Sequence, residues 1–91
     1  MVSKKVTVRN KSGLHMRPAT DLSKLCAKMQ SSITIVFGGK KINPKSVLML
    51  LSGGIKCGST IEVVCEGNNE NSDLAQIVDA INGGFGEEMI D

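Results

Sequence analysis

Short segments in which apolar and polar side chains alternate restrict the fold of this chain more than any other feature. A two-residue period places all apolar side chains on one face, so each segment predicts a half-buried β-strand. The alternating apolar residues are Val2, Val6 and Val8, then Ile33, Ile35 and Phe37, and finally Ile61, Val63 and Cys65. Gly38-Gly39 is a two-residue hairpin signal, which predicts that residues 40–42 return as another short strand. Such strands indicate an antiparallel sheet with one solvated face.

Three further segments repeat apolar residues at helical spacing, and they supply the cover that the apolar face of the sheet requires. The first runs from Met16 to about Met29, the second from Val47 to Leu51, and the third carries Leu74, Ile77, Val78 and Ile81 before Gly83-Gly84. The predicted order is β-α-β-β-α-β-α. This order indicates an α+β fold, a two-layer open-faced sandwich with three helices on one face of a four-stranded antiparallel sheet. We expect one domain over residues 1–91, because no linker or repeat interrupts the chain.

The composition argues against nucleic-acid binding and against membrane insertion. The net charge is only +2, the lysines are dispersed, and Phe37 and Phe85 are the sole aromatic residues. No segment approaches the ~18–20 continuous apolar residues of a membrane span. The first residues lack the apolar core of a signal peptide, so we expect a cytoplasmic protein.

The three cysteines, Cys26, Cys57 and Cys65, show no C-x-x-C spacing. An odd, dispersed set argues against a disulfide scaffold and against a zinc site, so we expect neither a metal nor another cofactor. Cys26 and Cys65 fall at apolar positions of a predicted helix and strand. We therefore expect both thiols to be inert core side chains.

The single histidine, His15, stands where the first strand gives way to the first helix. An imidazole titrates near neutrality and acts as a nitrogen nucleophile. Pro18 fits a helix only in its first turn, which places His15 at or beside the N-cap, where unpaired N–H groups favour a phosphate. Arg17 opposes the helix dipole, a local cost that makes sense if an anion is bound there. The sequence thus predicts a phosphoryl group carried on His15.

The run Gly13-Leu14-His15-Met16-Arg17-Pro18-Ala19, together with the element order, resembles the HPr family. These are the histidine-containing phosphocarriers of the bacterial phosphoenolpyruvate:sugar phosphotransferase system. A second family motif, Lys45-Ser46-Val47-Leu48 followed by Ser52-Gly53-Gly54-Ile55, lies at the spacing the family shows. The resemblance covers nearly the whole chain. It implies a carrier rather than an enzyme, which accepts a phosphoryl group on Nδ1 of histidine from phospho-enzyme I and passes it to IIA domains of sugar permeases.

The resemblance also implies roles for individual residues. The implied site residues are His15 as phosphoryl acceptor, Arg17 as phosphate stabiliser, Ser12, Met16 as a backbone donor, and Pro18. Ser46 is implied as a regulatory serine, phosphorylated by HPr kinase/phosphorylase and then bound by the catabolite control repressor CcpA. The expected partner-binding residues are Thr20, Val47, Leu48 and Leu51. We expect a monomer.

Two apolar features and one glycine depart from the family pattern. Met16 occupies a place that is usually Ala or Thr, and Gly53 replaces an apolar residue, which suggests a looser turn. The run Val47 to Leu51 differs in detail from other family members. It holds more apolar residues than one face of so short a helix can bury, which indicates either an exposed partner surface or a tight small core.

Two alternative functions can be weighed against the carrier. A purely regulatory paralogue would keep Ser46 and lose the histidine, so His15 counts against it. A small RNA-binding domain would need strand aromatics or a basic face. Gly83-Gly84-Phe85-Gly86 fits a GxxG pattern, but it lies at the end of a helix and is a weak signal.

Overall fold

Strands and helices follow one another in the predicted order. The structure, a computed structural model, describes residues 1–90. Its elements are β1 (Val2–Thr7), α1 (Met16–Ala27), β2 (Ser32–Phe37), β3 (Lys40–Ile42), α2 (Val47–Ser52), β4 (Thr60–Glu66), α3 (Glu70–Asn82) and a short 3₁₀ turn, η1 (Gly84–Gly86). No helix in this part of the chain is long and apolar enough to cross a membrane.

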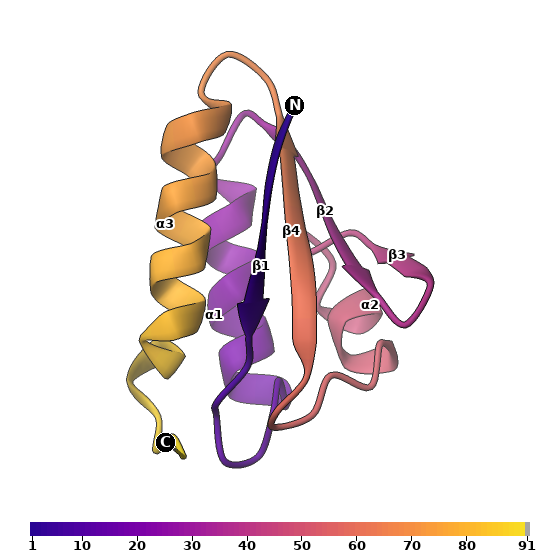
Figure 1. Ribbon diagram of the computed structural model, residues 1–91, viewed down its shortest axis with the longest axis vertical. Helices are drawn as coiled ribbons and strands as arrows, with labels where there is room; N and C mark the ends of the chain where they lie inside the picture. Colours follow the sequence, from indigo (N-terminus) through magenta and orange to yellow (C-terminus); the bar gives the residue numbers. More distant parts are fainter. Residues whose placement is uncertain (91) are drawn as a thin grey trace.

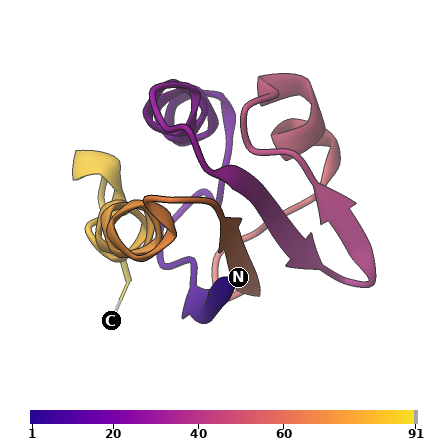
Figure 2. The same cartoon turned by 90° about the horizontal axis from the view of Figure 1, so that it is seen from above.

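The four strands form one antiparallel sheet in the order β1-β4-β2-β3 (Figure 1). The first strand of the chain therefore lies at one edge of the sheet and pairs with the last strand, β4, with Val2 opposite Cys65 and Thr7 opposite Thr60. Figure 2 shows the helices on one side of this sheet. The α+β open-faced sandwich is confirmed, and its layers follow from the strand pattern, since only one face of each strand is apolar.

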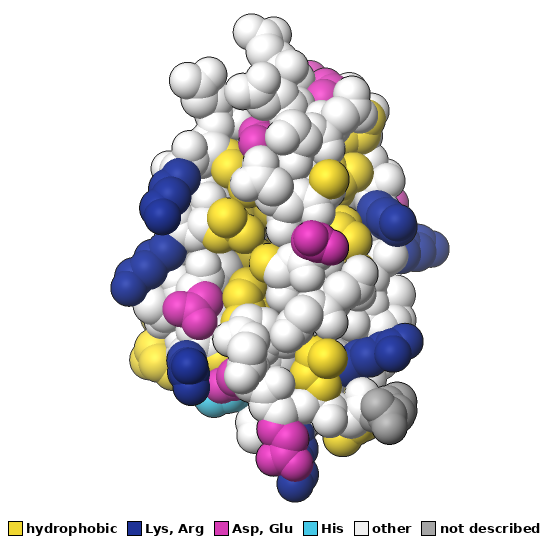
Figure 3. All heavy atoms as spheres, turned by 90° about the vertical axis from the view of Figure 1, so that its left-hand side faces the viewer, with side chains coloured by type: hydrophobic (Ala, Val, Ile, Leu, Met, Phe, Trp, Pro, Cys, Tyr) yellow, Lys and Arg dark blue, Asp and Glu magenta, His cyan; other side chains and the backbone are white. Residues whose placement is uncertain are grey.

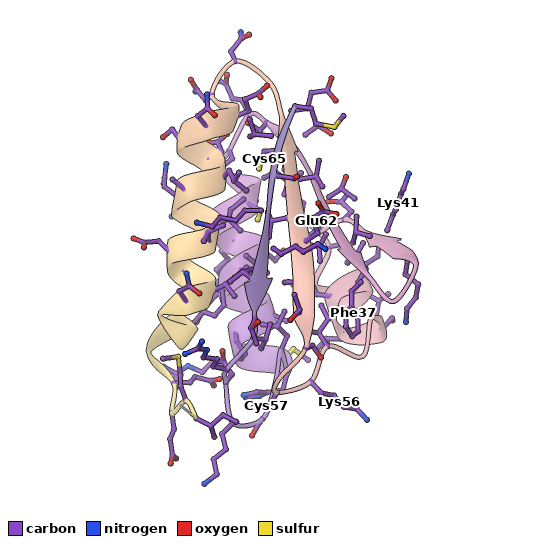
Figure 4. All side chains as sticks on the ribbon, viewed as in Figure 1. Phe37, Lys41, Lys56, Cys57, Glu62 and Cys65 are labelled. Atoms are coloured by element: carbon purple, nitrogen blue, oxygen red, sulfur yellow. The ribbon has the colours of Figure 1, made fainter. Side chains whose placement is uncertain are left out.

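The core lies between the sheet and the helices. Most of the apolar residues that alternate along the strands are buried with the apolar stripes of α1 and α3 and with Leu50 of α2, while Val2 and Phe37 are partly buried at the margin of this core. Cys26 and Cys65 belong to this core and are fully buried, as predicted. Cys57 lies apart, in the loop before β4 at the lower end of the molecule in Figure 4.

The first helix ends two residues earlier than predicted. It stops at Ala27, because the N–H groups of Lys28 and Met29 donate to the carbonyls of Leu25 and Cys26, three residues back. Such bonds tighten the last turn and end an α-helix. Met29 nevertheless stays buried, so its apolar side chain continues the helical stripe after the helix has ended.

The turn at Gly53 is held by backbone hydrogen bonds, although the sequence suggested a looser turn. Gly53 caps the C-terminus of α2, and its N–H donates to the carbonyls of Met49 and Leu50. A Cβ at this position would come within 2.6 Å of the Ile42 side chain. The side chain of Ile42 thus occupies the space that an apolar side chain at position 53 would fill.

Candidate functional site

His15 is the N-cap of α1, as the sequence predicted. Its backbone is extended and its carbonyl accepts the first helical hydrogen bond, from Ala19 N at 3.0 Å. Its side chain makes no capping hydrogen bond and is 44% exposed, so the ring is free for other chemistry. The N–H groups of Met16 and Arg17, in the first turn, have no acceptor within the helix, and Pro18 has no N–H to satisfy. Two backbone donors therefore follow the imidazole directly.

The loop before His15 is pressed against the loop that precedes β4. Gly13 has a φ of +69°, and a Cβ there would lie 2.7 Å from the carbonyl oxygen of Ile55. The next residue, Leu14, is buried and donates its N–H to the same carbonyl at 3.0 Å. Only glycine allows this close approach, and the packing fixes the backbone from which His15 projects.

The imidazole of His15 contacts a carboxylate from the C-terminal tail. Its Nε2 lies 3.0 Å and 3.1 Å from the two carboxylate oxygens of Glu87, and Asn10 Nδ2 donates to the same group at 2.9 Å. The hydrogen bond from Asn10, followed by the one from His15, lowers the pKa of the Glu87 carboxyl below its usual value. An ionised carboxylate only accepts, so Nε2 of His15 carries the hydrogen. Within residues 1–90, Nδ1 makes no hydrogen bond.

The residues around His15 line a shallow polar depression, composed of Lys11, Ser12, His15, Arg17, Gly86, Glu87 and Glu88. The structure thus brings Ser12 and Arg17 beside the imidazole, as the sequence predicted. Met16 is 60% exposed next to them, whereas Pro18 is buried and acts through the backbone. The lining also holds two carboxylates, with Glu88 facing Lys11 and Glu87 facing His15. The Arg17 guanidinium and the free N–H groups at the start of α1 are the donors that suit this depression to a phosphate.

Neither Glu87 nor Asn10 was predicted as a site residue. Asn10 belongs to a segment with the composition of a turn, and Glu87 lies 72 residues from His15 in the chain. No local motif could link them. Gly84-Phe85-Gly86, which fits part of an RNA-binding pattern, forms the turn that brings Glu87 to the imidazole.

The second predicted site lies on α2. Ser46 is its N-cap, and its hydroxyl accepts from Met49 N at 3.2 Å. The helix buries Leu50 completely, whereas Leu48 is 74% and Met49 41% exposed. Val47 and Leu51, two of the predicted partner-binding residues, are half-buried against the core. Most of the exposed apolar surface of this helix is therefore contributed by Leu48 and Met49.

Thr20, also predicted to bind partners, makes its side-chain hydrogen bond within α1. Its hydroxyl donates to the carbonyl of Met16 at 2.7 Å, within the first turns of α1. Helices α1 and α2 pack against each other. The hydroxyl of Ser23 in α1 also donates to the carbonyl of Lys45, in the segment just before α2, at 3.0 Å. His15 and Ser46 thus cap two adjacent helices.

The charged side chains do not form a polyanion-binding face in the view that Figure 3 gives. Lysine and arginine side chains are spread along both edges of that face, with acidic side chains between them. Among the residues that the structure describes, no three His, Cys, Asp or Glu side chains gather in a group able to hold a metal ion.

Comparison with known proteins gives the same family by sequence and by structure. The sequence model for "PTS HPr component phosphorylation site" matches residues 2–83. The chain is 40% identical to the HPr-like protein Crh of Halalkalibacterium halodurans over 78 residues, 86% of this chain and 93% of that protein. It is 34% identical to the phosphocarrier protein HPr of Treponema pallidum over 88 residues, 97% of this chain and 100% of that protein.

Solved structures agree. The crystal structure of HPr-C-His from Thermoanaerobacter tengcongensis superposes with a TM-score of 0.93 at 34% identity, covering 98% of this chain and 100% of that one. Crh of Bacillus subtilis, described as a domain-swapped dimer, superposes with a TM-score of 0.73 at 30% identity, covering 92% and 97%. The relatives named HPr are phosphocarriers rather than enzymes. This chain therefore belongs to the HPr family, the phosphocarrier proteins of the phosphotransferase system.

Proposed function

We propose that His15 accepts a phosphoryl group from phospho-enzyme I and donates it to the IIA domains of sugar permeases. The observation that carries this proposal is the position of the ring. An exposed imidazole caps α1, with Arg17 and the free first-turn N–H groups beside it and its Nε2 engaged by Glu87. The nitrogen left over, Nδ1, is the atom that the family uses as acceptor.

The remaining predicted residues act on the transferred group. A phosphoryl group passing between two nitrogens exposes charge on its oxygens, which fixed donors and cations stabilise. The guanidinium of Arg17 supplies a planar pair of donors, and Ser12 and the backbone N–H of Met16 supply single ones. Pro18 contributes by keeping the first turn helical and by lacking an N–H.

The similarity to Crh makes the regulatory paralogue the competing assignment. A paralogue of that kind needs the serine on α2 but not a histidine at the start of α1. In this chain the histidine is present and sits in a polar depression with a cation and two free amides. This arrangement favours the carrier.

The carrier assignment is tested by reconstituting the relay with phosphoenolpyruvate, enzyme I and a purified IIA domain. Wild-type protein should pass phosphate to the IIA domain, whereas the His15→Ala variant, folded by circular dichroism, should pass none. Transfer by the variant at the wild-type rate would overturn the assignment.

The exposed side of α2 is our proposed docking surface for these partners. Leu48 forms its exposed centre, Val47 and Leu51 support it from the core side, and Thr20 lies on the neighbouring α1. An apolar centre with a polar rim is the usual layout of a protein interface. The three partners that would share this surface are enzyme I, the IIA domains and the HPr kinase/phosphorylase.

Ser46 is the proposed regulatory site, and the specific observation is its position at the edge of this surface. It caps α2 directly before Val47 and Leu48. A phosphate there carries about −1.5 to −2 charges at neutral pH, which a helix N-terminus accommodates. The phosphoprotein would then repel acidic partner surfaces, and CcpA is its expected partner.

Ser46→Asp tests this second role. Aspartate is also a good N-cap, so the fold should be kept while negative charge is added. At low salt, enzyme I should phosphorylate His15 more slowly in this variant than in Ser46→Asn, which caps the helix without the charge. Equal rates for the two variants would refute the electrostatic mechanism.

We further propose a cytoplasmic monomer. In the monomer, β1 pairs over six residues with β4 of the same chain. The domain-swapped dimer described for Crh of Bacillus subtilis is the alternative, and light scattering across a concentration series distinguishes the two.

A further inference from the structure

We propose that Glu87 is a positioning residue for His15, and that Asn10 holds Glu87 in place. The contacts are Nε2 of His15 to the Glu87 carboxylate at 3.0 Å, and Asn10 Nδ2 to the same carboxylate at 2.9 Å. This role deepens the proposed function, because it rests on His15 being the phosphoryl acceptor.

The turn after α3 places Glu87 at the imidazole. Three consecutive residues, Gly84, Phe85 and Gly86, have φ values of +64°, +54° and +78°. Phe85 is the one non-glycine residue with positive φ in residues 1–90, a conformation that a β-carbon disfavours. A Cβ at Gly84 would collide with the side chain of Met89. The chain accepts an unfavourable backbone here, and the result is a tight reversal that directs Glu87 back toward α1.

The segment after Glu87 is fixed by pairing with the segment around Asn10. Lys11 N donates to the carbonyl of Glu88 at 3.1 Å, and Ile90 N donates to the carbonyl of Arg9 at 2.9 Å. The tail is therefore held on both sides of Asn10 by backbone hydrogen bonds. Glu87 is anchored at the turn before it and at this pairing after it, so its carboxylate is a fixed feature of the site.

The amide of Asn10 has a defined orientation. Its Nδ2 donates both to the carbonyl of Gly84 and to Glu87, each at 2.9 Å, and only the nitrogen end of an amide can serve two acceptors. Its oxygen is buried with no partner in the described residues, an arrangement that disfavours an asparagine kept for packing alone. Asn10 thus acts through its two N–H donors: one binds the carbonyl of Gly84 in the turn, and the other binds the carboxylate of Glu87.

The chemical consequence is a fixed tautomer of His15. The carboxylate retains the hydrogen on Nε2 and leaves a lone pair on Nδ1. When Nδ1 attacks phosphorus, an N–P bond forms at His15 and the N–P bond of the donor breaks, with its electron pair returning to the donor nitrogen. The ring gains positive charge, which Glu87 stabilises, and no proton leaves it. In the onward step the Nδ1–P bond breaks and its electron pair returns to Nδ1.

Glu87→Gln and Asn10→Ala test this role, together with one matched control. Glu87→Gln keeps the size of the side chain and removes its charge. Glu66→Gln makes the same change at the end of β4, where the side chain is exposed and lies outside the depression around His15. Asn10→Ala removes the support and leaves Glu87 itself intact.

The first measurement needs no phosphate. Nitrogen-15 NMR of the neutral imidazole reports which ring nitrogen carries the hydrogen. Wild type and Glu66→Gln should be predominantly protonated on Nε2, whereas Glu87→Gln and Asn10→Ala should populate both tautomers. In phosphorylation by enzyme I, Glu87→Gln should lower the maximal rate by about tenfold or more, the scale seen when a metal-bound imidazole loses the group that orients it. Glu66→Gln should stay within about twofold of wild type.

The outcomes separate this proposal from the carrier assignment. If Glu87→Gln shows the wild-type tautomer while wild type is phosphorylated normally, the positioning role is overturned and the carrier assignment is intact. If the tautomer changes as expected but wild type takes up no phosphate, the contact is supported and the carrier assignment fails.

Discussion

Leu48 and Leu50 are neighbours in α2 with opposite environments, and replacing each by alanine gives a sharp test of the docking surface. Leu50 is 0% exposed and Leu48 is 74% exposed. Alanine and leucine both favour helix, so neither change disturbs α2 through propensity. The comparison therefore isolates burial from partner binding.

The magnitudes follow from the exposed fractions. Leucine to alanine removes three carbon atoms, worth about 0.8 kcal/mol each when buried, or about 2.4 kcal/mol in total. For Leu50 the whole amount is lost, and the residual cavity adds to it, giving about 2–5 kcal/mol. For Leu48, 74% exposed, only about a quarter is lost, or about 0.6 kcal/mol. Leu50→Ala should thus lower Tm by about 10 °C or more, and Leu48→Ala by about 2–5 °C.

Binding should show the opposite order. If Leu48 is the exposed centre of the interface, its truncation should weaken binding of enzyme I by about 1–2 kcal/mol, roughly 5–30-fold in Kd. Leu48→Asp should weaken it further, because it adds a charge to a desolvated centre. Leu50→Ala should bind normally at temperatures where it is folded.

Thermal unfolding and isothermal titration with enzyme I measure both quantities on the same samples. A Leu48→Ala variant that binds with wild-type affinity would place the interface elsewhere. A Leu48→Ala variant as unstable as Leu50→Ala would show that this side of α2 is packed rather than exposed, and the reasoning from burial would be wrong.

Three further predictions concern the site and the core. Arg17→Ala should slow phosphoryl exchange with enzyme I far more than it lowers Tm, because the guanidinium acts on the transferring group; stopped-flow kinetics and calorimetry that show equal, small changes would contradict this. Iodoacetamide should label Cys57 alone in the native protein, since burial raises the pKa of the Cys26 thiol to about 12 and raises that of Cys65, and mass spectrometry of native and unfolded samples checks it. The pKa of Glu87 is held below its usual value of 4.5, so its stabilising effect is present above that pH and is lost as the pH falls through the lower folded-state value. Glu87→Gln should therefore show a shallower loss of Tm below about pH 4.5 than wild type does, and parallel curves would count against the contact.

Local signals predicted the two helix caps correctly. Pro18 marks the first turn of α1, and this is enough to place His15 at the N-cap. Ser46 before an apolar run similarly predicts the N-terminus of α2. Both follow from residues close together in the sequence, where the backbone geometry leaves few alternatives.

The contacts of His15 with the tail could not be predicted in this way. Glu87 and Asn10 are joined through a turn in which Phe85 adopts a positive φ, and no propensity favours that conformation. The pairing of residues 88–90 with 9–11 depends on where α3 ends relative to β1, which is a property of the packed fold. Sequence patterns predict the elements, whereas this contact needs their arrangement.

The apolar run of α2 shows the same limit on a smaller scale. The sequence left open whether this run forms an exposed partner surface or a tight small core, and of its expected partner-binding residues Val47, Leu48 and Leu51 only Leu48 is exposed. Packing against the core decides that Leu50 is buried and that Leu48 and Met49 face outward. Met49 was therefore missed as a candidate for partner binding.

The central claim, that the phosphoryl group is carried on His15, is tested most directly by intact mass. Wild-type protein is incubated with phosphoenolpyruvate and enzyme I and weighed before and after brief acid treatment. We predict a gain of one phosphoryl group that acid removes, because a phosphorus–nitrogen bond on histidine is acid-labile. A gain that survives acid, as a phosphoserine would, or no gain at all, would contradict the account.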